Sequence, residues 1–182
     1  MRYIVLASFL VSLVFLAGCA DKKETTTTDA AAFVQFGSQQ WEKSNFGCDP
    51  NKAPCATVKL DYPQAIFGDD DVKAAINGKI KNYVMQSIVM AGGKEGSNIE
   101  ELALNILDNH GSEEEKNLKV FGNVMFRSHN MVKIEMSSFD DKGEKDDEIN
   151  RTLFTFNLKD GKLVSETVLQ NGTVTKANIS MN

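Results

Sequence analysis

The sequence predicts an α+β fold in which two helices pack on one face of an antiparallel sheet. Two observations carry this prediction. Between strand-like segments lie two runs, 69–91 and 97–110, whose apolar residues recur at helical spacing. After them come four β-rich segments separated by short turn signals, which is typical of an antiparallel meander.

The chain begins with a segment typical of an export signal. Arg2 is the only charged side chain before Cys19, and residues 3–15 are almost wholly apolar, a stretch too short for a comfortable membrane span. Residues 16–19, Leu-Ala-Gly-Cys, resemble the bacterial lipobox at every position. This resemblance implies cleavage before Cys19 and acylation, with chains such as palmitate, that would anchor the protein stably in a membrane. An ordinary secretory signal that ends in cysteine by coincidence is the alternative.

Residues 20–31 are polar and rich in threonine, which predicts a flexible linker. We therefore expect a signal peptide at 1–18, the lipidated Cys19 and linker at 19–32, and a single α+β domain at 33–182. The expected location is the bacterial cell envelope. Ala20, in place of an aspartate after the cysteine, favours the outer membrane, with the domain facing the periplasm, if the host is Gram-negative.

The chain is acidic, with 25 acidic against 20 basic side chains, and cleavage after residue 18 lowers the net charge from −5 to about −6. This balance argues against nucleic acid as a partner and against electrostatic adhesion to anionic lipid. It is compatible with a basic protein partner.

Two cysteines, Cys48 and Cys55, remain as an even pair in an oxidising compartment. The segment between them, Asp-Pro-Asn-Lys-Ala-Pro, is rich in turn formers, so we predict a disulfide between the two thiols. The loop-entropy model assigns it about 2.5 kcal/mol of stability. A redox-active or metal-binding pair is the alternative, although six intervening residues do not form a CxxC motif.

The first strands are expected at 33–46, as one arm of a hairpin, and at 55–62, where apolar and polar residues alternate until Pro63 ends the strand. The aromatic residues of the first segment either form a ligand-binding platform or, as is usual beside a strand, contribute to the core. They are Phe33, Phe36, Trp41 and Phe46.

Two helices follow. Acidic residues at 69–71 favour a helix start, and Gly92-Gly93 ends the first helix. The second begins with a capping box of Ser97 and Glu100 and ends before Gly111. Their apolar faces are Val72, Ile76, Ile80, Tyr83, Val84, Ile88 and Ala91 in the first, and Ile99, Leu102, Ala103, Ile106 and Leu107 in the second.

The remaining strands are predicted at 118–126, 131–139, 152–158, 163–168 and 174–179. Asp160-Gly161 and Asn171-Gly172 mark tight turns, because glycine readily supplies the positive φ that such turns need.

Three segments resemble a known family of envelope domains. They are 56–63, Ala-Thr-Val-Lys-Leu-Asp-Tyr-Pro; a helix containing 75–77, Ala-Ile-Asn; and 155–162, Thr-Phe-Asn-Leu-Lys-Asp-Gly-Lys. Such domains occur in lysozyme-sensing anti-sigma factors and ahead of the catalytic domain of some peptidoglycan deacetylases. The resemblance covers about residues 55–170 and implies an α+β fold with a lysozyme-binding surface.

The chain departs from this family in two ways. A charged segment at 140–148 replaces the Gly-Gly-Ala-His-like segment that family members often carry. No second hydrophobic segment, sigma-factor domain or deacetylase domain is apparent, so the signalling and catalytic roles do not transfer.

The sequence offers little for catalysis. It has no phosphate-binding glycine loop, HExxH or GxSxG motif, and no nucleophile–base constellation. His110, at a helix end, and His129, in a turn, are typical of solvated histidines, with a role as ligand or base as the alternative. We therefore expect no enzyme activity, metal or cofactor.

The acidic segment is the candidate partner-binding site. Calcium is one hypothesis, but the D-x-D-x-D-G spacing is missing. Mutual repulsion instead predicts a mobile hairpin tip that attracts a basic partner such as lysozyme. The candidate residues are Asp140, Asp141, Glu144, Asp146, Asp147 and Glu148.

These observations predict a membrane-anchored lipoprotein with a non-catalytic domain that binds lysozyme, another envelope protein or a cell-wall component. The alternative is a structural or assembly lipoprotein of an envelope complex. An enzyme with a divergent site is a third, more distant reading.

Overall fold

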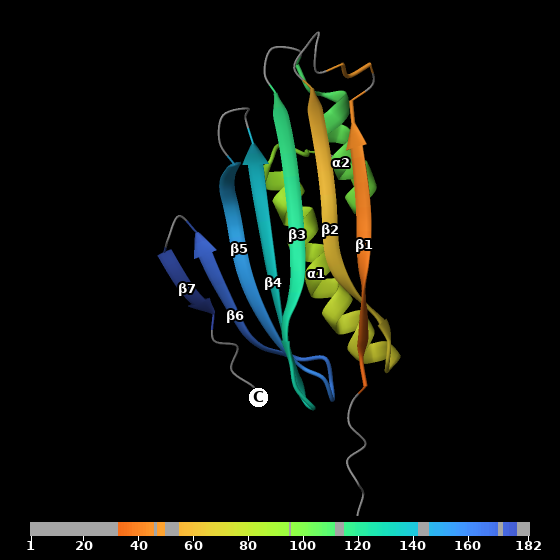
Figure 1. The fold of residues 1–182 in the computed structure, drawn as a ribbon, viewed down its shortest axis with the longest axis vertical. Coiled ribbons are helices and arrows are strands. Elements are labelled where there is room, and N and C mark those ends of the chain that lie inside the picture. The colour runs from red at the N-terminus through yellow and green to blue at the C-terminus, as the bar shows by residue number, and fades with distance from the viewer. Residues whose placement is uncertain are drawn as a thin grey trace, which may run out of the picture. The chain divides into compact units, whose positions relative to one another are not determined.

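A computed structural model describes residues 33–45, 47–49, 55–94, 96–111, 115–141, 146–170 and 173–177. The predicted signal peptide, the lipidation site Cys19 and the linker lie outside the described residues. The described residues form a seven-stranded sheet and two helices (Figure 1).

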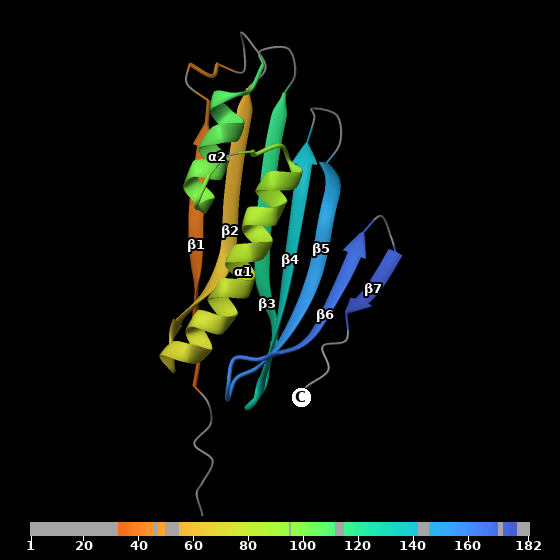
Figure 2. The same ribbon diagram turned by 180° about the vertical axis from the view of Figure 1, so that it is seen from behind.

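The strands follow one another across the sheet in chain order. They are β1 (Gln35–Ser44), β2 (Ala56–Phe67), β3 (Lys116–Arg127), β4 (Met131–Asp141), β5 (Asp146–Asn157), β6 (Leu163–Gln170) and β7 (Thr173–Ala177). The helices α1 (Asp70–Met90) and α2 (Ile99–Asp108) connect β2 to β3 and lie on one face of the sheet (Figure 2). Neither of these helices is long and apolar enough to cross a membrane.

The predicted fold class is wrong in one respect, because the sheet is mixed and not purely antiparallel. β2 and β3 run parallel, with Val58 beside Leu118 and Leu60 beside Val120, whereas all the other neighbouring strands are antiparallel. The cause is the connection between these strands. Both helices lie in it, and a crossover of that length returns the chain to the end of the sheet where β2 began. The fold is α+β-like, with strands in the majority.

Pro63 does not end β2, contrary to expectation. The β2–β3 pairing stops at Asp61, so the last part of β2 pairs with β1 alone, and a residue without an amide hydrogen is tolerated there. Beside it, β3 carries Gly122. A Cβ at this position would lie 2.5 Å from Cδ of Pro63 and would also collide with Met136, so only glycine fits.

The helix predictions are confirmed in extent and corrected in one cap. Asp69 caps α1 by accepting hydrogen bonds from the amides of Asp71 and Val72. α2 is capped by Asn98, one residue later than expected, with its side chain accepting from the amide of Glu101. Glu101 in turn accepts from the amide of Ser97 at 2.7 Å, and this bond lowers the pKa of the Glu101 carboxyl.

The core lies between the helices and the inner face of the sheet. Side chains two residues apart on the central strands point toward α1, as the alternation of strand residues requires. The apolar stripe predicted for α1 packs against them. The largest fully buried side chains include Phe154, Phe156, Leu60, Ile76, Ile80, Ile88, Leu118, Ile134 and Met136.

Candidate functional site

The candidate acidic residues gather at the end of the sheet where β4 ends and β5 begins. Asp140 pairs with Asp147 across the two strands, and Asp141 pairs with Asp146. These acids were expected in a mobile hairpin tip, but the structure places them in the strands themselves. Glu144 lies outside the described residues. The backbone register therefore pairs acidic residues with acidic residues at two positions, and like charges in directly opposed positions destabilise a strand pair.

Strand alternation sends the last two acids of β4 to opposite faces. Asp140 pairs with Leu118, whose side chain is fully buried on the helix-covered face. Its Oδ1 is buried and has no hydrogen-bond partner among the described residues. Asp141 lies on the helix-free face, with its carboxylate 3.6 Å from Nζ of Lys119. A ligand that approaches one face of the sheet can therefore contact only some of the candidate acidic residues.

Glu148 belongs to a small ion-pair network on the helix-free face. Its carboxylate lies 2.6 Å from Nη2 of Arg151, and Nε of Arg151 is 4.0 Å from Glu135. All three side chains are a third or more exposed, so each pair contributes only a fraction of a kcal/mol. Lys119 and Arg151 thus balance part of the charge, and a basic ligand would have to compete with them.

Behind the acidic end lies a buried polar cluster that the sequence did not reveal. The Tyr83 hydroxyl donates to the carbonyl oxygen of Asn150 at 2.8 Å and joins α1 to β5. Burial raises the pKa of Tyr83 to about 12, with smaller opposing contributions from Ser138 and Ser87. Tyr83 and Ser87 share one helix face four residues apart, and that spacing was the available signal. The cluster joins the helix to the strand that carries the acids.

The predicted Cys48–Cys55 disulfide is confirmed, with a Cα–Cα distance of 5.4 Å. It joins the end of the β1–β2 hairpin, where Asn45 also binds both backbone groups of Ala56. The amide of Lys116, at the start of β3, donates to the carbonyl of Cys55 at 3.0 Å. Since Asn117 then pairs with Asp141, the disulfide supports the same end of the sheet as the acids.

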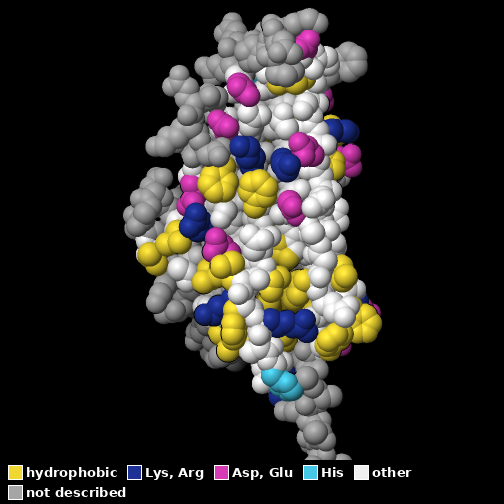
Figure 3. Space-filling model, in the orientation of Figure 1, with side chains coloured by type: hydrophobic (Ala, Val, Ile, Leu, Met, Phe, Trp, Pro, Cys, Tyr) yellow, Lys and Arg dark blue, Asp and Glu magenta, His cyan; other side chains and the backbone are white. Residues whose placement is uncertain are grey.

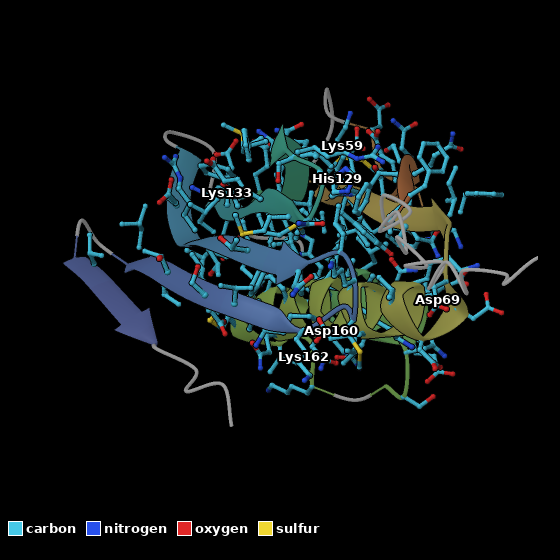
Figure 4. The ribbon with its side chains drawn as sticks, turned by 90° about the horizontal axis from the view of Figure 1, so that it is seen from below. Lys59, Asp69, His129, Lys133, Asp160 and Lys162 are labelled. Carbon is cyan, nitrogen blue, oxygen red and sulfur yellow. A yellow bond between two sulfur atoms is a disulfide. The ribbon has the colours of Figure 1, made fainter. Side chains whose placement is uncertain are left out.

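The two histidines are not brought together. His110 follows α2, and its Nε2 is buried without a hydrogen-bond partner among the described residues. His129 lies exposed in the β3–β4 turn, at the end of β4 remote from Asp141 (Figure 4). Within the described ranges, no three His, Cys, Asp or Glu side chains are grouped so as to hold a metal ion.

The aromatic residues of the first segment separate in the structure. Phe36 and Trp41 are partly buried against the core, whereas Phe33 is 53% exposed, and Phe46 lies outside the described residues. They do not form one platform. A hollow of about 380 Å³ lies instead between β2, α1 and the start of α2, lined in part by Tyr62, whose pKa is raised by burial.

The fold is similar to two solved structures of DUF3298 family proteins. The protein from Pseudomonas aeruginosa PAO1 has a TM-score of 0.57 and 15% identity over 74% of this chain. The protein from Bacteroides fragilis has a TM-score of 0.54 and 13% identity, also over 74%. The chain spans 56% and 60% of the lengths of these two proteins. The sequence itself matches no family and no curated protein. The likeness therefore places the chain with a bacterial α+β domain by fold alone.

Proposed function

We propose that the protein is a lipid-anchored envelope lipoprotein whose domain binds a basic protein through the acidic end of β4 and β5. The observation that carries the proposal is the opposition of Asp140 to Asp147 and of Asp141 to Asp146. Like charges in such a register repel each other, and a cationic ligand at this end of the sheet relieves the repulsion. The free domain already bears the cost of this repulsion, so its relief adds to the binding energy.

A binding role without catalysis agrees with the arrangement of the side chains. The charged partners of the acids are Lys119 and Arg151, which neutralise charge, and neither histidine lies beside them on the strands. Lysozyme is the basic ligand that the resemblance to the anti-sigma factor domains suggests. Another envelope protein or a cell-wall component with cationic groups would satisfy the same chemistry.

The anchoring part of the proposal is supported by the sequence. The lipobox-like residues 16–19 direct acylation to Cys19, and the other two cysteines are joined to each other, so they do not compete for that role. The protein would then reside in the envelope, in the outer membrane if the host is Gram-negative, with the domain facing the periplasm.

A second function, assembly of an envelope complex, is favoured by the outer edge of β1. Among the described strands β1 has only β2 as a neighbour, so its other edge presents unpaired backbone groups. A strand of a resident envelope protein could extend the sheet there.

Affinity capture from solubilised envelope, with residues 20–182 as bait, separates these functions. Lysozyme or another basic protein in the eluate, lost when the bait carries Asp146→Lys and Asp147→Lys, supports binding through the acidic end. Recovery of one membrane complex by both baits alike would contradict it and favour assembly through β1.

A further inference from the structure

A second surface lies at the other end of the sheet, where large apolar side chains are exposed. Phe33 precedes β1, Phe67 ends β2, Met125 and Phe126 lie near the end of β3, and Met131 begins β4. Between 40% and 59% of each of these side chains is exposed. We call them the apolar end. Exposed apolar side chains that gather in one place mark an interaction surface more often than isolated ones do.

The apolar end is continuous in space. The rings of Phe33 and Phe67 meet edge to face with their centroids 5.7 Å apart. The guanidinium of Arg127 lies 5.4 Å from the Phe33 ring, which joins the start of β1 to the end of β3. A β-bulge between Val124 and Phe126 then pairs Phe126 with Lys133 on β4.

Cationic groups accompany these side chains. Lys133 pairs with Phe126 on the helix-free face, and Arg127 lies over the Phe33 ring. Arg127 and Lys133 are exposed, and neither forms an ion pair with another described residue. Figure 3 shows hydrophobic and basic side chains over the lower half of this face, with the acidic ones mainly over the upper half. Asp69 and Asp160 lie on the helix side of the sheet (Figure 4), and the acid nearest to Lys133 along β4 is Glu135.

We propose that the apolar end docks on the bilayer that holds the lipidated Cys19. Phe126 and the neighbouring apolar side chains would enter the headgroup region, and Arg127 and Lys133 would bind lipid phosphates. This inference rests on the lipid anchor of the proposed function. The net acidity of the chain opposes adhesion of the whole molecule to anionic lipid, but on the helix-free face the acidic side chains lie mainly over the half away from the apolar end.

Chain length places the membrane within reach of this surface. Phe33 is itself part of the apolar end, and the 13 residues between it and Cys19 span at most about 48 Å when fully extended. β4 has 11 residues, so its acidic end is about 33 Å from its first residue. Docking at the apolar end would therefore direct the acidic end away from the bilayer, toward a partner in the periplasm.

The charge of this surface favours a membrane over a basic protein or a second copy of the chain as its binding partner. A basic protein would be repelled by Arg127 and Lys133. A second copy in a two-fold symmetric contact would bring the same two cations against each other. Lipid phosphates supply the opposite charge at the depth where the aromatic rings would lie.

Quenching of tryptophan fluorescence by brominated lipid tests the docking. The full lipidated chain, with Trp41→Phe to remove its only native tryptophan, is placed in vesicles of phosphatidylglycerol and brominated phosphatidylcholine. We expect Phe126→Trp to lose about half of its fluorescence, because interfacial side chains reach the bromine-bearing region. Val89→Trp is the matched control, since Val89 is 53% exposed at the far end of α1, and we expect it to keep its fluorescence.

Adding Arg127→Gln and Lys133→Gln to Phe126→Trp should reduce the quenching if the cations hold lipid phosphates. Equal quenching of both reporters, or of neither, would overturn the docking proposal. Incorporation of labelled palmitate, abolished by Cys19→Ala, is measured on the same preparations. A labelled chain without quenching contradicts docking alone, whereas an unlabelled chain contradicts the anchor on which the proposed function rests.

Discussion

Asn77 is predicted to be the polar residue of α1 whose substitution lowers the stability most. Its side chain makes the hydrogen bonds to β2 that a neighbouring strand would otherwise make. Its Oδ1 accepts from the amide of Ala65 at 2.8 Å, and its Nδ2 donates to the carbonyl of Ala65 at 2.9 Å. These bonds occur beyond Asp61, where β2 has lost β3 as a neighbour. Ala65 is 3% exposed, so water cannot replace the side chain. The Ala-Ile-Asn motif of the family resemblance contains this residue.

Asn77→Ala removes two hydrogen bonds and leaves a buried amide and a buried carbonyl unpaired. At about 1 kcal/mol for each group, plus part of the desolvation cost, the free energy of unfolding should fall by about 3 kcal/mol. With a urea m-value of about 2 kcal/mol/M, the midpoint shifts by about 1.5 M. Lys81→Ala, an exposed change one turn further along α1, should stay within about 0.5 kcal/mol of the parent.

Asn77→Asp makes the test specific. An ionised aspartate keeps the acceptor for the Ala65 amide but sets a negative charge against the Ala65 carbonyl. A protonated one can donate to that carbonyl, as the amide does. The folded variant thus favours the protonated form, and its stability relative to the parent should rise as the pH falls from 7 toward 4. A loss of stability in Asn77→Asp that does not change with pH, or parental stability in Asn77→Ala, would contradict the role of Asn77 in binding the backbone of Ala65.

Two further predictions concern stability. The pKa of Tyr83 is about 12 in the folded state against 10.0 for an unburied tyrosine, so its contribution to stability is complete below pH 10 and is lost between pH 10 and 12, by about 3 kcal/mol in total. Tyr83→Phe should remove most of this alkaline loss in urea titrations, and an unchanged loss would count against the burial of its hydroxyl. Replacing both Cys48 and Cys55 by serine should lower the free energy of unfolding by about 2.5 kcal/mol, because the loop constraint is lost. The reduced parent should have the same stability as the double variant. A parental stability that reductant does not change would contradict the role of the disulfide.

The local features of the fold could be predicted from the sequence. The structure confirms the apolar stripe of α1, the acidic residues at its start and the turn at Gly161. Each of these features is determined by residues close together in the sequence. Gly161 has a φ of 69°, and a Cβ there would lie 2.9 Å from that of Ala75. The cap of α2 was misplaced by one residue because Ser97 and Asn98 are both good capping residues.

The features that the sequence did not reveal depend on distant partners. β2 pairs with β3 in parallel because the connection through the two helices returns the chain to the end of the sheet where β2 began. No local sequence pattern predicts this pairing. The strand pattern favours a core position for Phe126. The β-bulge beside it shifts the alternation of side chains between the two faces and places Phe126 opposite Lys133. The acidic segment reads as a loop because repulsion disfavours strand pairing, yet the β4–β5 ladder continues to Asp141 and Asp146.

Titration of lysozyme into residues 20–182 tests the binding role of the acidic end most directly. We expect salt-dependent binding that Asp146→Lys with Asp147→Lys weakens at least about ten-fold, equivalent to about 1.4 kcal/mol. Asp71→Lys with Asp108→Lys changes the net charge equally at two exposed helix positions and should leave the affinity within about two-fold of the parent. Equal affinity in the parent and both variants would contradict binding through the acidic end, as would an equal loss of affinity in both variants.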